Sequence, residues 1–142
     1  MASKVIFVGR ATAETIGPFH DWAMISIGEP DASNGPPNIK PGWHSIHRTS
    51  FHDVDPQYGS SNGVPSDVYQ CMTIEDARSI VAFVRDEARL ADVIVVHCRA
   101  GISRSAAVAK WIAREYGLAF DYKYNKINMH VFRLMDQAGH EE

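Results

Sequence analysis

Cys98 and Arg104 stand six positions apart in a run at 97–105 that reads HCRAGISRS. The apolar stretch at 93–96 before it predicts a buried strand, and the stretch at 106–112 after it predicts a helix. The order strand, tight loop, helix directs several backbone N–H groups and a helix N-terminus at one point. Such a point binds a tetrahedral oxyanion, and here a cysteine lies in the middle of it.

The residue types in this loop suit attack on phosphorus by sulfur. A thiolate is favoured by a helix N-terminus, by converging amides and by a nearby arginine, and Cys98 is expected to have all three. The planar fork of Arg104 can hold two phosphate oxygens, and Gly101 lets the backbone approach the ligand closely. Ser105 can donate to the Cys98 sulfur when it departs in a second step. The alternative interpretation is a buried cysteine beside a surface arginine.

The run at 97–105 resembles the HCxxGxxR[ST] signature of the protein tyrosine phosphatase superfamily, and most of all its dual-specificity branch. The resemblance implies a phosphocysteine intermediate, with no metal and no organic cofactor. It assigns catalysis to Cys98, Arg104 and Ser105, and gives His97 the role of orienting the loop and tuning the thiol. It also implies that the loop positions bind the substrate phosphate: Arg99, Ala100, Gly101, Ile102, Ser103 and Arg104.

That mechanism needs an aspartate to protonate the leaving oxygen, and three candidates lie upstream: Asp53, Asp55 and Asp67. The segment FHDVDP at 51–56 resembles the F-x-D segment of dual-specificity relatives, which implies that Asp53 is the acid. The usual spacing from acid to cysteine favours Asp67 instead, unless the turn-rich stretch 58–65 is an inserted loop. We therefore predict Asp53, with Asp55 and then Asp67 as the alternatives.

Composition limits the class of protein. The 142 residues are expected to form one catalytic domain at 1–142, and the 45% hydrophobic share is typical of a globular protein. A net charge of −3 argues against a general nucleic-acid binder, and no apolar run is long enough for a membrane span or a signal peptide. A free catalytic thiol fits a reducing, cytoplasmic setting, although oxidation could still join Cys71 to Cys98.

No metal site is expected from the seven histidines, because only His44 and His47 stand at even a loose ligand spacing. The predicted partners are a phosphorylated protein substrate and phosphate-like anions such as phosphate, sulfate and vanadate. No nucleic acid and no membrane are expected as partners, and the chain is expected to be a monomer.

The remaining pattern predicts an α/β domain with a mostly parallel central sheet and helices on both faces. Thr73 is the expected N-cap of a helix, with acidic residues in its first turn. Strands are predicted at 4–8, 23–28, 45–51 and 93–96, a short turn or helix at 12–16, and helices at 74–88, 105–116 and about 125–138. The site is then expected at the carboxyl end of the sheet, where ligands bind in such folds.

The substrate is less sharply indicated. The resemblance implies phosphotyrosine in proteins, with phosphoserine and phosphothreonine next, whereas relatives also act on phosphoinositides or on RNA 5′-phosphates. Arg99 is the only basic residue among the variable loop positions, which gives little support to a polyanionic lipid. Two alternatives lie outside phosphatase chemistry: a sulfurtransferase and a non-catalytic phosphate-binding module.

Overall fold

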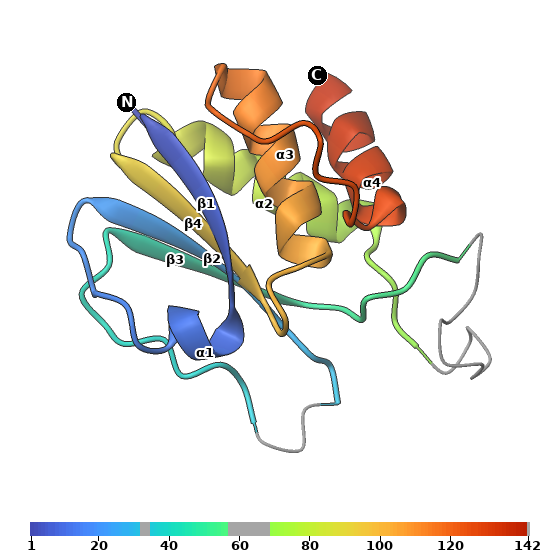
Figure 1. The fold of residues 1–142 in the computed structure, drawn as a ribbon, viewed down its shortest axis with the longest axis horizontal. Helices are drawn as coiled ribbons and strands as arrows, with labels where there is room; N and C mark the ends of the chain where they lie inside the picture. Colours follow the sequence, from blue (N-terminus) through green and yellow to red (C-terminus); the bar gives the residue numbers. More distant parts are fainter. Residues whose placement is uncertain (32–34, 57–68, 142) are drawn as a thin grey trace.

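The computed structural model describes residues 1–31, 35–56 and 69–141. Four strands form one sheet in the order β1-β4-β2-β3, and every neighbouring pair is parallel (Figure 1). The strands are β1 (Lys4–Gly9), β2 (Trp22–Gly28), β3 (Ser45–Ser50) and β4 (Val93–Cys98). The predicted strands therefore form, and the sheet is parallel throughout.

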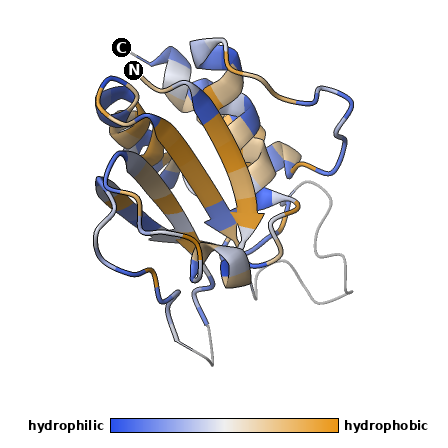
Figure 2. Ribbon diagram, turned by 60° about the vertical axis from the view of Figure 1, so that its left-hand side comes forward, coloured by the Kyte–Doolittle hydropathy of each residue, from blue (hydrophilic) through white to orange (hydrophobic). Residues whose placement is uncertain are grey.

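Strand β4 lies between β1 and β2, and all six of its residues are buried. Its apolar residues fit this position, because a parallel strand covered on both faces has no solvent side to which polar residues can turn. Strand β4 is accordingly drawn mostly in the colour of hydrophobic residues in Figure 2. The register pairs Gly9 with Cys98 and Ser26 with His97, so the carboxyl ends of three strands meet where β4 ends.

Three helices cover one face of the sheet: α2 (Ile74–Glu87), α3 (Arg104–Tyr116) and α4 (Met129–His140). Thr73 is the N-cap of α2, as predicted: its hydroxyl accepts from the Asp76 N–H, while the Asp76 carboxylate accepts from the Thr73 N–H. The core between the helices and this face includes Ile25, Ile27, Ile94, Val96, Val84, Trp111, Ile112 and Met135. No helix in the described part of the chain is long and apolar enough to cross a membrane.

The opposite face of the sheet differs from our prediction, which placed helices on both faces. Its only described helix is the four-residue α1 (Arg10–Ala13), and an irregular segment supplies the rest of the cover. Ile39 and Trp43 of that segment pack with Ala13 against Met24 and the outer side of β4. Proline and glycine in the segment at 35–42 disfavour a helix there, so side chains from an extended chain close this smaller core.

Two predicted boundaries differ from the structure. The last helix starts at Met129 and not near residue 125, because the Asn128 side chain caps it by accepting from the Val131 N–H. The first short helix begins at Arg10, directly after β1, and ends at Ala13. The predicted inserted loop at 58–65 lies outside the described residues.

Candidate active site

The candidate site is the loop at 99–103, which joins the end of β4 to the start of α3. Cys98 is the last residue of β4, and its side chain is buried, with 2% exposure. Its Sγ lies 3.1 Å from the Oγ of Ser105, which is fully buried in the first turn of α3. The hydroxyl therefore stands where it can donate a hydrogen bond to a thiolate.

Gly101 allows the loop to turn back against β1. Its φ is +72°, in the left-handed region that glycine adopts without strain. A Cβ at this position would also overlap the backbone of Val8 and Gly9. The loop consequently packs directly on the end of β1, and only glycine fits there.

Donors outside the loop hold three of its carbonyl groups. The Arg99 oxygen accepts from the Arg10 N–H at 3.1 Å, the Ser103 oxygen from the Asn128 N–H at 3.1 Å, and the Ile102 oxygen from the Tyr124 hydroxyl. In a trans peptide the following N–H points opposite to the carbonyl. The N–H groups of the next residues are therefore turned away from these donors, as binding of an anion within the loop requires.

Helix α3 begins without a side-chain cap. Ser103 occupies the N-cap position, but its hydroxyl donates to Asp53 Oδ1 at 2.8 Å and does not cap the helix. A helix with an uncapped N-terminus keeps its first N–H groups and the positive end of its dipole available for an anion. The N–H groups of the loop and the N-terminus of α3 thus converge on one place, beside the Cys98 sulfur.

The Arg104 guanidinium is buried, with 4% exposure, and is held from two sides. It donates to the Phe51 carbonyl oxygen and to the Glu29 carboxylate, each at 2.6 Å. Its Nε is buried and has no hydrogen-bond partner among the described residues. A buried N–H without a partner is costly, and a phosphate oxygen in the loop is the natural acceptor for it.

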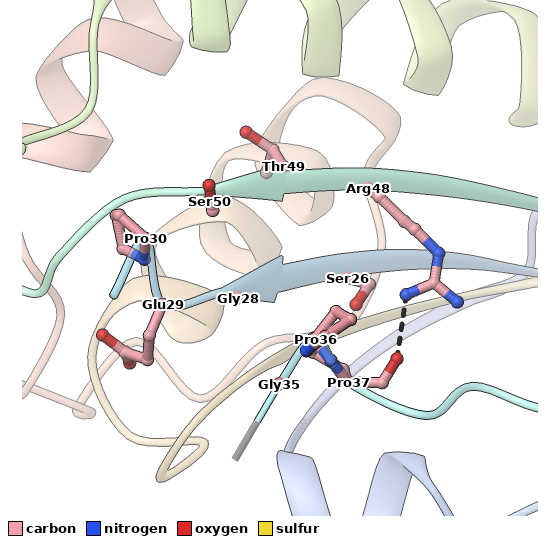
Figure 3. Close-up of a pocket in the computed structure, with 10 residues that line it drawn as sticks. All are labelled: Ser26, Gly28, Glu29, Pro30, Gly35, Pro36, Pro37, Arg48, Thr49 and Ser50. Atoms are coloured by element: carbon pink, nitrogen blue, oxygen red, sulfur yellow. Dashed lines mark hydrogen bonds between the residues drawn. The ribbon is translucent and has the colours of Figure 1, made fainter. Parts of the chain in front are cut away.

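Glu29 also borders a pocket of about 400 Å³ beside the ends of β2 and β3 (Figure 3). Ser26 lines the same pocket, and its Oγ lies 2.6 Å from His97 Nε2. On the other side Arg48 donates to the Pro37 carbonyl oxygen at 2.9 Å, which ties the 35–37 segment to β3. Two residues that support the loop, Ser26 and Glu29, therefore face this pocket.

His97 is fully buried, and desolvation lowers its pKa from 6.5 to about 4. Its Nδ1 lies 3.4 Å from the Cys98 carbonyl oxygen, and its Nε2 faces the Ser26 hydroxyl. A neutral ring satisfies both contacts when Nδ1 carries the hydrogen and Nε2 accepts from the serine. The ring thus braces the backbone next to the nucleophile.

The three candidate acids have separate surroundings. Asp53 is exposed, and its Oδ1 accepts from both Ser103 in the loop and Asn128, each at 2.8 Å. Asp55 instead forms an ion pair with Arg133 of α4 at 3.1 Å. Asp67 lies outside the described residues. Asp53 is thus hydrogen-bonded to the loop, and Asp55 is ion-paired to α4.

Comparison with solved structures places this arrangement in a known fold. The human tyrosine phosphatase-like serine/threonine/tyrosine-interacting protein superposes with a TM-score of 0.62 at 16% identity, over 94% of this chain and 89% of that one. Tk-PTP in its active form gives a TM-score of 0.52 at 10% identity, over 97% of this chain and 92% of that one. The chain has the protein tyrosine phosphatase fold. No protein-family model and no curated protein sequence matches it.

Within the phosphatase fold, the predicted substrate-binding residues all lie on the loop or at its end. Arg99, Ala100 and Ile102 are exposed, whereas Arg104 is buried beneath them. Both cysteines are free, and Cys71 is partly buried. The structure brings Cys98, Arg104 and Ser105 together with Asp53 at the carboxyl end of the sheet.

One group of described residues has the composition of a metal site. Potential ligand atoms of Glu29, Asp31 and His52 lie within 4.8 Å of one another. However, His52 Nδ1 accepts from the Gln70 N–H at 2.8 Å, so the hydrogen of the neutral ring is on Nε2, which lies 2.9 Å from Asp31. That nitrogen has no lone pair for an ion, and Glu29 is already bound to Arg104. The arrangement is better described as a hydrogen-bonded cluster.

Four residues around the loop were not singled out from the sequence: Glu29, Ser26, Tyr124 and Asn128. Each contacts the loop or its flanking residues from a distant part of the chain; Glu29, for example, is 75 positions from Arg104. Only Asn128 had a usable signal, because asparagine before an apolar helix is a typical N-cap. That signal locates the helix start but not the contact with Asp53.

Proposed function

We propose that the protein is a metal-independent cysteine phosphatase that hydrolyses phosphate monoesters through a phosphocysteine intermediate. The observation that carries this proposal is the position of Cys98 Sγ, 3.1 Å from Ser105 Oγ, at the uncapped start of a helix. The buried Arg104 guanidinium with a free Nε supports it as well. The fold shared with Tk-PTP is consistent with this chemistry.

In the first step, the Cys98 thiolate attacks phosphorus in line with the leaving oxygen. The S–P bond forms as the P–O bond breaks, and Asp53 gives a proton to the departing oxygen. The loop N–H groups and Arg104 stabilise the charge on the three equatorial oxygens. Each of these groups is already held in place before the ester binds.

In the second step, water attacks the phosphocysteine. Asp53, now ionised, takes a proton from that water, and the S–P bond breaks to release phosphate. Ser105 donates a hydrogen bond to the departing thiolate, which makes the sulfur a better leaving group. The enzyme returns to its starting state with Cys98 ionised and Asp53 protonated.

The substrate class proposed is phosphotyrosine in proteins, followed by phosphoserine and phosphothreonine. Ile102 is 47% exposed at the loop, so it presents an apolar surface to a bound ester. Arg99 is the one basic side chain among the variable positions of the loop, which places phosphoinositides and RNA 5′-phosphates behind phosphoproteins. We further propose that the chain acts as a cytoplasmic monomer.

A non-catalytic phosphate-binding module is the second candidate. The human protein compared above is named as tyrosine phosphatase-like and as an interacting protein. The loop here nevertheless contains the cysteine, and its sulfur contacts a buried hydroxyl that binding alone does not require. The two candidates differ in one measurable property, turnover.

The test is hydrolysis of p-nitrophenyl phosphate in the presence of EDTA, with the wild type, Cys98→Ser and Cys71→Ser. Loss of the nucleophile is expected to reduce kcat by a factor on the order of 10⁴ or more, because a serine hydroxyl, unlike a cysteine thiolate, is not ionised near neutral pH. Cys71→Ser is the matched control and is expected to retain activity. Tungstate binding is expected to persist in Cys98→Ser, since Arg104 and the loop are unchanged.

The outcomes separate the candidates. A wild type that binds tungstate without hydrolysing aryl phosphates supports the binding module, and turnover of thiosulfate supports a sulfurtransferase. Full hydrolysis by Cys98→Ser contradicts the phosphocysteine mechanism. Activity abolished by EDTA contradicts metal independence.

A further inference from the structure

Asn128 is buried, with 7% exposure, between the start of α4 and the segment that carries Asp53. Its Nδ2 lies 2.8 Å from Asp53 Oδ1 and 3.2 Å from the Val54 carbonyl oxygen. Its Oδ1 accepts from the Val131 N–H at 3.1 Å. One side chain therefore caps a helix and contacts the candidate acid.

The helix fixes the orientation of this amide. The Val131 N–H is a donor, so it needs the oxygen of the Asn128 side chain opposite it. The nitrogen must then point the other way, where it meets two acceptors, the Asp53 carboxylate and the Val54 carbonyl. Rotating the amide by 180° would break all three contacts, so the geometry leaves one arrangement.

Asn128 also reaches the phosphate loop through its backbone. Its N–H donates to the Ser103 carbonyl oxygen at 3.1 Å, while the Ser103 hydroxyl donates to the same Asp53 Oδ1 at 2.8 Å. The three residues form a closed set of hydrogen bonds that joins the acid segment, the loop and α4. Asp55 and Arg133 form the neighbouring ion pair and strengthen the link between this segment and α4.

We propose that Asn128 is the positioning residue for the general acid, a role that rests on the proposed phosphatase function. Both hydrogen bonds to the Asp53 carboxyl end on Oδ1, which leaves Oδ2 to carry the proton. During the first step the Oδ2–H bond breaks as the proton moves to the leaving oxygen. The carboxylate that remains keeps the Asn128 Nδ2–H and Ser103 Oγ–H bonds, and it accepts a proton from water in the second step.

The test compares Asn128→Ser with the matched control Asn125→Ser. Serine remains a good N-cap for α4, but it is too short to reach Asp53 with a donor. Residue 125 lies on the same segment and is exposed. Each variant is assayed with phenyl phosphate, whose leaving group needs a proton, and with 2,4-dinitrophenyl phosphate, whose leaving group departs without one.

We expect Asn128→Ser to lose about tenfold or more of its kcat/KM on phenyl phosphate and little on the dinitrophenyl ester, as partial loss of acid catalysis requires. The ratio kcat/KM reports the steps up to departure of the leaving group, whereas hydrolysis of the phosphocysteine is common to both esters. Asn125→Ser is expected to match the wild type on both esters. In an Asp53→Ala background, Asn128→Ser is expected to cause no further selective loss on phenyl phosphate. Thermal unfolding of each variant reports the structural effect separately.

Equal losses of kcat/KM on both esters, or a selective loss of kcat/KM that persists without Asp53, overturn the positioning role while the phosphatase function stands. The positioning role is also overturned if Asn128→Ser shows a selective loss on phenyl phosphate and the single variant Asp53→Ala shows none, because another group would then be the acid. A wild type that hydrolyses neither ester overturns the proposed function, and this role with it.

Discussion

The burial of His97, next to the nucleophile, lowers the pKa of its side chain and so makes the stability of the protein depend on pH. Desolvation holds its pKa at about 4, against 6.5 for an exposed histidine. Between these two pH values the unfolded chain binds a proton that the folded chain does not. This contribution to stability is therefore present above pH 6.5 and is lost as the pH falls towards 4.

The expected size of this loss is about 3 kcal/mol, since each pH unit between the two pKa values corresponds to about 1.4 kcal/mol. Urea unfolding at pH 7 and at pH 4.5 measures it in the wild type, in His97→Asn and in the exposed-site control His140→Asn. We expect the pH dependence to be shallower in His97→Asn alone, because other titrating groups are common to all three proteins. Identical pH dependence in the wild type and His97→Asn would contradict the assignment.

At the scale of residues, the sequence predicts what is local and misses what is brought together by folding. Cys98, Arg104 and Ser105 lie within eight positions, so one strand, one loop and one helix turn bring them to the same point. Glu29 is 75 positions from Arg104 and follows a different strand, and nothing in its neighbours marks it as the partner of a buried guanidinium. Long-range contacts of this kind depend on strand order, which the pattern of hydrophobic residues does not specify.

At the scale of elements, the loop between β4 and α3 depends on Gly101, where the close approach to β1 leaves no room for a side chain. We expect Gly101→Ala to abolish phosphate binding, because its Cβ would overlap the backbone of β1 at a φ of +72°. The loop must then move away from β1, and its N–H groups no longer converge. Tungstate binding followed by calorimetry measures this loss.

Gly117→Ala is the matched control for this prediction. Gly117 has a φ of +63° at the C-terminus of α3, but a Cβ there meets no neighbouring atom. Its substitution is expected to cost about 1 kcal/mol of stability and to leave tungstate binding intact. Equal effects of the two substitutions on binding would show that backbone strain, and not the contact with β1, is what matters.

Helix limits were predictable where a cap stands at the boundary. Thr73 with acidic residues after it marks the start of α2, and the structure confirms that start with a capping box. The apolar spacing of Ile127 and Val131 continues back beyond the cap, so the sequence pattern predicts a start for α4 that is several residues too early. Periodicity fixes which face of a helix is buried, whereas the side-chain cap fixes where the helix begins.

At the scale of the molecule, the site joins elements that are far apart in the sequence. Arg104 at the start of α3 binds Glu29 after β2 and Phe51 after β3, and Ser103 is linked to Asp53 and Asn128. An oxyanion in the loop supplies the missing partner of Arg104 Nε and reinforces all these contacts. Its binding is therefore expected to stabilise the whole domain and not only the loop.

The measurement is thermal unfolding with and without tungstate. At a concentration about one hundred times Kd, a ligand that binds only the folded state adds about 2.7 kcal/mol, which raises Tm by roughly 5–10 °C for a chain of this size. We expect this rise in the wild type and in Cys98→Ser, because sulfur is not needed to bind the anion. Arg104→Met is expected to lose most of it, whereas Arg114→Met, which removes a surface ion pair with Asp136, is expected to keep it. An undiminished rise in Arg104→Met would place the anion elsewhere on the protein and would remove the link between the loop and the stability of the sheet.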